Sequence, residues 1–353
     1  MTLWLKRIGF VLALAFLVMT FVNASWIAER PTGYPRLLAV RGISQQPNNL
    51  PATLAAADGV CTADNIEVPV HDYIENTLPA LQRASGMGAA MVSVDVAQSS
   101  DGRIVLLREA TLDCRTSGKG AVSAMTLAQL KAIDAGHGYS ADGGKSFPLR
   151  GMGIGYVPTL EETLSALPTE PILFNLGGQD QALSARLIDA LLAAGRKVED
   201  LGDGFMGSEA AIAPIRQRFP KSWAFSMEAA RACTSAYQLQ GWLGLTPASC
   251  KGGTILVPLN RQWQFAGWPN RLIARMAAVG GHIVVTGPAS DGAEPRGLDL
   301  PEQIGQVPAS FNSHIWVSDL WVIGPALHPA GDRRNGREKA ETEALIAKRR
   351  ENR

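Results

Sequence analysis

Residues 91–107 read MVSVDVAQSSDGRIVLL. Met91–Val96 and Ile104–Leu107 are short apolar runs, and the SSDG between them is a turn signal, so this stretch predicts two strands. Similar apolar runs recur along the chain, at residues 36–40, 172–176, 224–226, 254–257, 282–286 and 314–317. Helical periodicity lies between them, at residues 73–85, 126–133, 160–167, 182–194, 210–219, 227–239 and 269–279.

Roughly eight strands alternating with helices predict a parallel sheet covered by helices. The strand count and the length of 353 residues fit an α/β fold of the TIM type, a closed (β/α)8 barrel. A doubly wound open sheet is the alternative, but no G-x-G-x-x-G motif follows the first strand.

The composition is that of an ordinary globular protein, with 46% apolar residues, 18% charged residues and a net charge of +1. No strongly basic field is present, which argues against nucleic acid as a partner. The C-terminal residues 331–353 are highly charged and nearly without apolar side chains. We expect them to form a disordered, solvated tail, with weak attraction to an anionic membrane surface as the alternative.

The N-terminal residues 1–25 resemble a membrane-targeting segment. Lys6 and Arg7 precede 15 residues without a charge, at positions 8–22. The segment is either an uncleaved transmembrane anchor or a signal peptide, with Val22 and Ala24 as the small residues before the cut. Both alternatives place the rest of the chain outside the cytoplasm, either anchored on the periplasmic side or secreted, and we expect a barrel domain over residues 26–330.

The four cysteines suit an oxidising compartment. No two of them have the spacing of a metal site, so zinc is not expected. We predict two disulfides, Cys61–Cys114 and Cys233–Cys250, the second of which closes a short loop. Buried free thiols are the alternative.

In a barrel of this type, chemistry takes place where the strands end. The polar residues at the predicted strand ends are Arg41, Asp95, Arg108, Glu109 and Asn175. These side chains are therefore the first candidates for a functional site.

Four stretches, LAVRGIS, YIENTLPAL, GAAMVSVDVAQSSDGRIVLLREATLDCRTSGKG and VPTLEETL, lie in this order along the chain. Their motifs and spacing resemble the glycerophosphodiester phosphodiesterases, barrel enzymes of the phospholipase-C-like superfamily, over roughly residues 36–325. The likeness is greatest to a membrane-anchored or secreted bacterial subgroup. The resemblance implies hydrolysis of a phosphodiester by two histidines, with a divalent cation (Ca²⁺ or Mg²⁺) held by a Glu-x-Asp pair and a further glutamate.

The sequence departs from that pattern at most of the residues that carry chemistry. The two family histidines are replaced by Val40 and Arg108, so no residue is assigned a catalytic role with confidence. Asp95 and Glu109 remain as weak metal ligands, but the acidic partner of Asp95 is Ser93. Further along, Asn175 and Gly177 stand for the family's glutamate and lysine.

The remaining polar groups suggest binding. Arg41 and Arg108, with Glu75 of the ENT motif, are candidates for holding a phosphate, because guanidinium pairs with phosphate in a bidentate way. The alternative is that Arg108 pairs with Glu109 or Asp95 and neutralises an abandoned metal site.

Two further features are open to more than one interpretation. His71 is a possible replacement acid or base, although a lone histidine is more often structural. The aromatic side chains of Trp263, Phe265 and Trp268 either line the mouth of the barrel or a membrane-facing rim, or simply pack.

Three functions follow from this sequence. The first is a degenerate phosphodiesterase (a pseudoenzyme) that binds a phosphate-bearing lipid head group or a glycerophosphodiester and so belongs to lipid metabolism. The second is an active metal-dependent phosphodiesterase with an altered site. The third is a non-catalytic binding module tethered to the membrane by its N-terminal segment.

Overall fold

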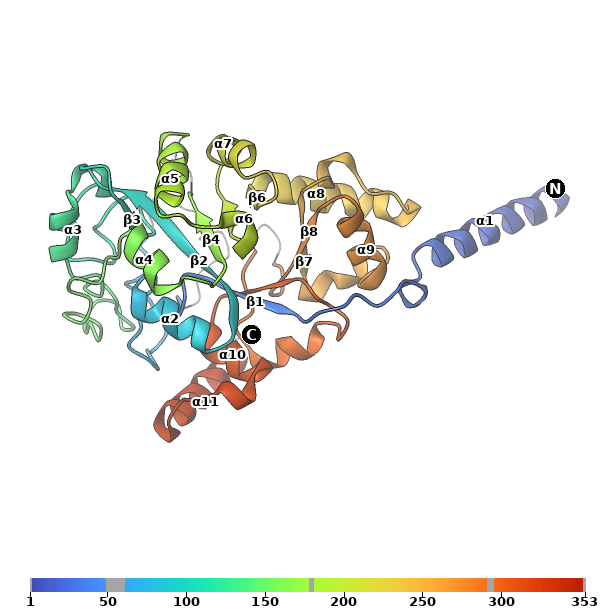
Figure 1. Ribbon diagram of the computed structural model, residues 1–353. Helices are drawn as coiled ribbons and strands as arrows, with labels where there is room; N and C mark the ends of the chain where they lie inside the picture. The colour runs from blue at the N-terminus through green and yellow to red at the C-terminus, as the bar shows by residue number, and fades with distance from the viewer. Residues whose placement is uncertain (1, 49–60, 178–180, 291–294, 352–353) are drawn as a thin grey trace.

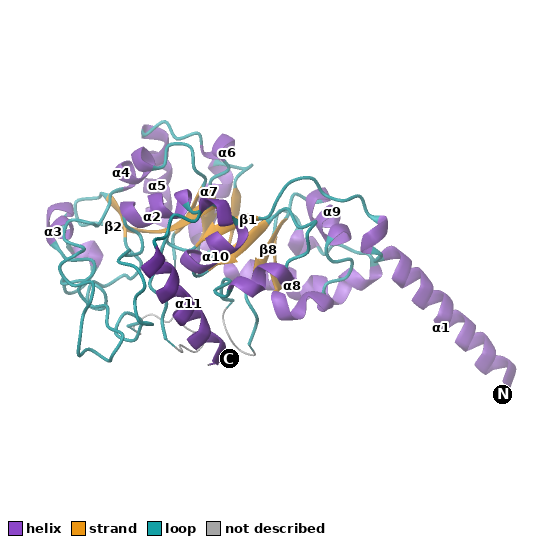
Figure 2. Cartoon of the chain, turned by 90° about the horizontal axis from the view of Figure 1, so that it is seen from below, coloured by secondary structure: helices purple, strands orange, loops and turns teal. Residues whose placement is uncertain are grey.

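The structure, a computed structural model, describes residues 2–48, 61–177, 181–290 and 295–351. At its centre, parallel strands in the order β6-β5-β4-β2-β1-β9-β8-β7 form a nearly closed barrel surrounded by helices (Figure 1, Figure 2). The strands are β1 (Arg36–Ala39), β2 (Ala89–Gln98), β4 (Ile172–Asn175), β5 (Gly204–Met206), β6 (Trp223–Phe225), β7 (Thr254–Pro258), β8 (His282–Thr286) and β9 (His314–Val317). The predicted TIM-type architecture is confirmed.

The first α-helix projects away from the barrel, and the last one packs on it (Figure 1). They are α1 (Thr2–Val22), α2 (Leu78–Gly86), α3 (Leu127–Ala132), α4 (Leu160–Ala166), α5 (Gln181–Ala193), α6 (Val198–Leu201), α7 (Glu209–Arg218), α8 (Met227–Gln240), α9 (Asn270–Ala278), α10 (Leu320–Leu327) and α11 (Gly336–Glu351). The predicted helix over 73–85 begins only at Leu78, because Asn76 has a positive φ of 57° that a right-handed helix cannot contain.

One predicted barrel strand belongs elsewhere. Ile104–Leu106 forms β3, which pairs antiparallel with β2 and stands outside the barrel. The eighth barrel strand is instead β5, a three-residue strand that the sequence analysis missed. A short run such as Gly204–Met206 carries almost no periodicity, whereas the turn before Ile104 signals a hairpin and says nothing about which sheet the strand joins.

Aromatic rings fill the barrel where the sheet closes. The indole Nε1 of Trp223 on β6 donates to Thr254 Oγ1 on β7 at 2.9 Å, joining the two end strands. The Trp223 ring stacks on His282 and His314, with ring centroids 5.1 and 4.7 Å apart. Burial, with a smaller effect of Arg36, lowers the pKa of His282 to about 4 and that of His314 to about 3, so both histidines are neutral core residues.

A loop-rich module beside β3 carries a small core of its own, built around Leu112, Leu130, Tyr139 and Leu149. The Cys61–Cys114 disulfide fastens this module to the segment that follows β1. Cys233, in the middle of α8, and Cys250, in the short turn before β7, form the second disulfide. Both predicted pairings are present.

The C-terminal segment differs from the expected disordered tail, because residues 336–351 form α11 and pack on the barrel. Arg349 carries the contact: its Nε donates to Glu67 Oε1 at 2.9 Å and its Nη2 to Asp319 Oδ2 at 2.7 Å. The Trp321 indole also donates to Thr342 Oγ1 of α11 at 3.0 Å. A helix held by buried ion pairs leaves little hydrophobic signal in its sequence.

We predict that Arg349→Ala destabilises the full chain by about 3–5 kcal/mol, because it leaves two carboxylates without their buried cation. Arg350→Ala is the matched control, since its side chain is 54% exposed, against 6% for Arg349, and pairs with Glu302 at the surface. Its cost should stay below about 1 kcal/mol. Urea unfolding in detergent measures both, and equal effects of the two substitutions would contradict the buried cluster.

Candidate functional site

The candidate site lies at the carboxyl ends of β1, β2 and β4. Arg41 follows β1 with a positive φ of 58°, and its carbonyl accepts the Asn76 N–H at 3.1 Å. Its own N–H donates to Ser93 Oγ on β2 at 3.1 Å. Left-handed backbone at non-glycine residues is costly and tends to occur where the surroundings fix it, so Arg41 and Asn76 are held in place by their contacts.

Asp95, the last residue of β2 that pairs with β4, accepts hydrogen bonds from two side-chain amides. Its Oδ2 accepts the Asn76 side-chain amide at 2.9 Å, and its Oδ1 accepts the Asn175 amide at 2.6 Å. The Asp95 N–H donates in turn to Asn76 Oδ1 at 3.0 Å. Both oxygens of this buried carboxylate are therefore engaged by neutral donors.

Beside Asp95 lies a group that we call the arginine cluster, which consists of Arg41, Glu75, Arg108, Glu109 and Arg115. Arg115 lies at its centre, with Nη1 3.2 Å from Glu75 Oε1 and Nε 2.6 Å from Glu109 Oε1. Arg41 Nε lies 3.4 Å from the same Glu75 oxygen, and Arg108 Nε lies 4.0 Å from Glu109 Oε1. Three guanidinium groups thus share two carboxylates.

The electrostatics of the cluster follow from this excess of cations. Repulsion from Arg41, with burial and a contribution from Arg115, lowers the pKa of Arg108 to about 10. Burial opposes ionisation of Glu75, but the guanidinium groups of Arg115, Arg41 and Arg108 outweigh it and hold its pKa below the ordinary value. With three guanidinium groups and two carboxylates, the cluster has a formal net charge of +1.

Arg115 is the site residue that the sequence analysis missed. It directly follows Cys114, and Thr62 directly follows Cys61, so the disulfide brings these two residues together. Arg115 Nη2 donates to Thr62 Oγ1, which also accepts Arg108 Nη1 at 3.2 Å. The one signal in the sequence was its place next to Cys114, since a loop residue beside a disulfide is positioned by the crosslink.

The His71 side chain is held by hydrogen bonds and packs against an aromatic ring. Its Nδ1 lies 3.1 Å from Gln45 Nε2 and accepts the Tyr73 N–H at 3.3 Å, and its ring packs 5.0 Å from that of Trp321. Burial lowers its pKa to about 4, so the imidazole is neutral at pH 7. Within the described ranges we find no hydrogen bond or ion pair between His71 and the arginine cluster, which gives no support to a role in proton transfer.

The three aromatic residues of the predicted rim differ in their environments. The Trp263 side chain is exposed, whereas Phe265 is buried in the main core. Trp268 packs on Phe311 and donates to Gln262 Oε1 at 2.7 Å. Phe265 and Trp268 are therefore packing residues.

The residues present do not fit the divalent cation that the family pattern implies. Both oxygens of Asp95 accept amide hydrogens, and Glu75 and Glu109 face guanidinium groups at ion-pair distance. Among the residues that the structure describes, no cluster of three or more His, Cys, Asp or Glu side chains could hold a metal. Ca²⁺ requires 6–8 oxygen ligands, and this arrangement offers its carboxylates to other partners.

A family model and two relatives resemble this chain over part of its length. The family model described as "Glycerophosphoryl diester phosphodiesterase family" matches residues 69–243. The uncharacterized protein Rv2277c of Mycobacterium tuberculosis is 35% identical over 103 residues, which cover 29% of this chain and 34% of that protein. A glycerophosphodiester phosphodiesterase of Caldanaerobacter subterraneus is 32% identical over 102 residues, covering 29% of this chain and 38% of the relative. The matches thus span between a third and two fifths of these relatives.

Two solved structures share the fold. A glycerophosphoryl diester phosphodiesterase from Parabacteroides distasonis has a TM-score of 0.50 and 14% identity, covering 91% of this chain and 95% of its own. An Oleispira antarctica phosphodiesterase in complex with the product sn-glycerol-3-phosphate has a TM-score of 0.51 and 17% identity. The match covers 84% of this chain and 96% of that structure's chain. Residues 69–243 thus belong by sequence to the glycerophosphodiester phosphodiesterase family, and the barrel that contains them has the fold of these solved structures.

Proposed function

We propose that this chain is a non-hydrolysing member of the family that binds a phosphate-bearing head group at the arginine cluster. The observation that carries the proposal is that three guanidinium groups share the carboxylates of Glu75 and Glu109, and repulsion from Arg41 lowers the pKa of Arg108. An anion between the two guanidinium groups would relieve that repulsion. Charge-assisted hydrogen bonds from arginine to phosphate are among the strongest in proteins.

The cluster has the organisation that a binding site needs. Arg115 is almost fully buried and is held by two carboxylates, so it fixes the floor of the cluster. The side chains of Arg41 and Arg108 are each 18% exposed, so solvent reaches them. A ligand can therefore approach the outer pair of arginines, while the inner one stays in its ion pairs.

Loss of hydrolysis follows from the chemistry of the replaced groups. Val40 has no proton to transfer, and Arg108, with a pKa of about 10, stays protonated at neutral pH. General acid–base catalysis contributes about 10²–10⁴-fold in rate, and both family positions for it are occupied by groups that cannot supply it.

The proposed ligand class is a phosphate group on a glycerol-like or lipid head group. The Oleispira antarctica relative was solved with sn-glycerol-3-phosphate, which makes this compound the natural probe. A charge-carrying, partly exposed pair of arginines also predicts binding that weakens as salt concentration rises.

The proposal predicts that sn-glycerol-3-phosphate binds to the full chain in detergent, as measured by calorimetry. We expect saturable binding that Arg108→Ala weakens by about 10- to 100-fold, since a hydrogen bond to a charged group contributes about 1.5–3 kcal/mol. Arg103→Ala is the matched control, because Arg103 pairs with Glu161 at the surface. Absence of binding to the wild-type chain would refute the proposal and favour a tethered module without a ligand.

The proposal also makes a prediction about hydrolysis of glycerophosphodiesters by the same preparation. We expect no turnover above the buffer rate, with or without added Ca²⁺ or Mg²⁺, because neither a proton-transferring pair nor a set of cation ligands is in place. Release of glycerol phosphate is the readout. Metal-dependent turnover that Asp95→Ala abolishes would establish the alternative, an active phosphodiesterase with an altered site.

A further inference from the structure

The end of α1 is bound to the barrel domain. The Asn23 side-chain amide donates to the Trp242 carbonyl at 2.8 Å. Arg275 of α9 donates through Nη2 to the Val22 carbonyl at 3.1 Å and to Asn23 Oδ1 at 3.0 Å. The next residue, Ala24, is almost completely buried. These contacts fix where the chain passes from α1 into the folded domain.

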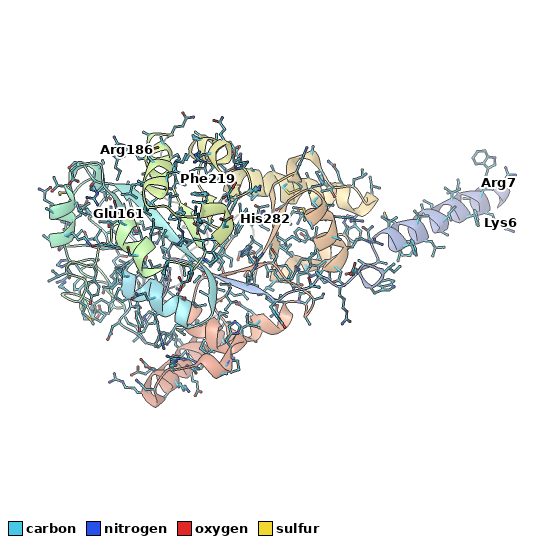
Figure 3. All side chains as sticks on the ribbon, in the orientation of Figure 1. Lys6, Arg7, Glu161, Arg186, Phe219 and His282 are labelled. Atoms are coloured by element: carbon cyan, nitrogen blue, oxygen red, sulfur yellow. A yellow bond between two sulfur atoms is a disulfide. The ribbon has the colours of Figure 1, made fainter. Side chains whose placement is uncertain are left out.

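Among the described residues, α1 is the one helix long and apolar enough to cross a membrane, over Trp4–Val22. It projects from the α8–α9 side of the barrel (Figure 1, Figure 2), and Lys6 and Arg7 lie near its far end (Figure 3). Cleavage after Ala24 would remove the partners of Arg275 described above. The docking of Val22 and Asn23 therefore favours a retained anchor over a cleaved signal peptide.

A group of exposed apolar side chains lies next to this point. We call it the apolar tip, and it consists of Leu239, Trp242, Leu243 and Leu245, at the end of α8 and in the turn that follows. Leu239 is 79% exposed and Leu243 is 69% exposed. Exposed apolar side chains gathered on one loop indicate an interaction surface, and here the Trp242 carbonyl itself accepts the hydrogen bond from Asn23.

The apolar tip is held firmly. It lies inside the loop that the Cys233–Cys250 disulfide closes, and Cys250 Sγ also lies 3.3 Å from the Cys233 carbonyl. Arg275 Nη1 donates to the Gly241 carbonyl at 3.1 Å, so the same side chain binds both the tip and the end of α1. A preorganised apolar loop loses little conformational entropy when it is buried.

A groove of about 450 Å³ lies between the end of α1 and α9, beside the tip. It is lined by Phe21, Val22, Gly244, Arg271, Ala274, Arg275 and Ala278. Arg271 lines this groove as a partly exposed cation. A cation next to the end of a membrane helix is well placed for the phosphates of lipid head groups.

We propose that the apolar tip enters the interface of the same bilayer that α1 crosses, with Arg271 facing the lipid phosphates. The barrel would then contact the membrane at two neighbouring points. Tryptophan is favoured at membrane interfaces, and apolar side chains that enter from the surface reach about 5–10 Å into the boundary between head groups and acyl chains. Two attachments restrict rotation of the barrel about α1 and so orient its mouth relative to the membrane.

The test uses the full chain in phosphatidylcholine nanodiscs. Leu243→Cys is labelled with an environment-sensitive nitrobenzoxadiazole dye, while the native cysteines are protected in their disulfides. Leu192→Cys, at an exposed leucine near the end of α5, is the control. We expect doxyl-labelled lipids to quench the dye at position 243 several-fold more strongly than the dye at position 192.

Equal quenching at the two positions would overturn the proposal. A dye at position 243 that is shielded from water but not quenched by doxyl lipids would also overturn it, because protein, such as a second copy of the chain, would then cover the tip. Trp242→Phe gives an independent measurement that leaves Leu243 in place. It should reduce the doxyl quenching of the intrinsic tryptophan fluorescence, and unchanged quenching would contradict insertion of the tip.

Discussion

The ion pair between Arg115 and Glu75 is the interaction on which the candidate site depends. A buried guanidinium is stable only when carboxylates surround it, and Glu75 and Glu109 supply them. This pair joins the loop after β3 to the segment before α2, and the same two carboxylates also pair with Arg41 and Arg108. The excess positive charge at the mouth of the barrel is a consequence of that arrangement.

The two disulfides have parallel roles at opposite sides of the molecule. Cys61–Cys114 positions Arg115, at the centre of the arginine cluster, and its partner Thr62, and Cys233–Cys250 closes the loop that carries the apolar tip. Each crosslink holds an irregular segment that no sheet or long helix would fix. The proposed head-group site and the proposed membrane contact are therefore both stabilised by covalent bonds, and they are consistent with a protein that acts at a lipid surface.

The fold was largely predictable because apolar runs and helical stretches alternate regularly along the chain. The errors are instructive: Ile104–Leu106 looked like a barrel strand but pairs antiparallel beside it, and Gly204–Met206 was too short to be recognised. For the site, Arg41 and Arg108 were found because both follow strands. Arg115 was missed because it lies in a loop, where position depends on the Cys61–Cys114 crosslink and leaves no periodic pattern.

The sequence by itself determined the alternation of strands and helices and the presence of Val40, Arg41 and Arg108 at the ends of two of the predicted strands, because these follow from residue identity and local pattern. Only the tertiary structure decided how the charges are shared. It assigned amide partners to Asp95, two carboxylates to Arg115 and a docked position to the charged helix around Arg349. Ion pairs join residues far apart in sequence, and their partners are chosen by distance and burial after folding.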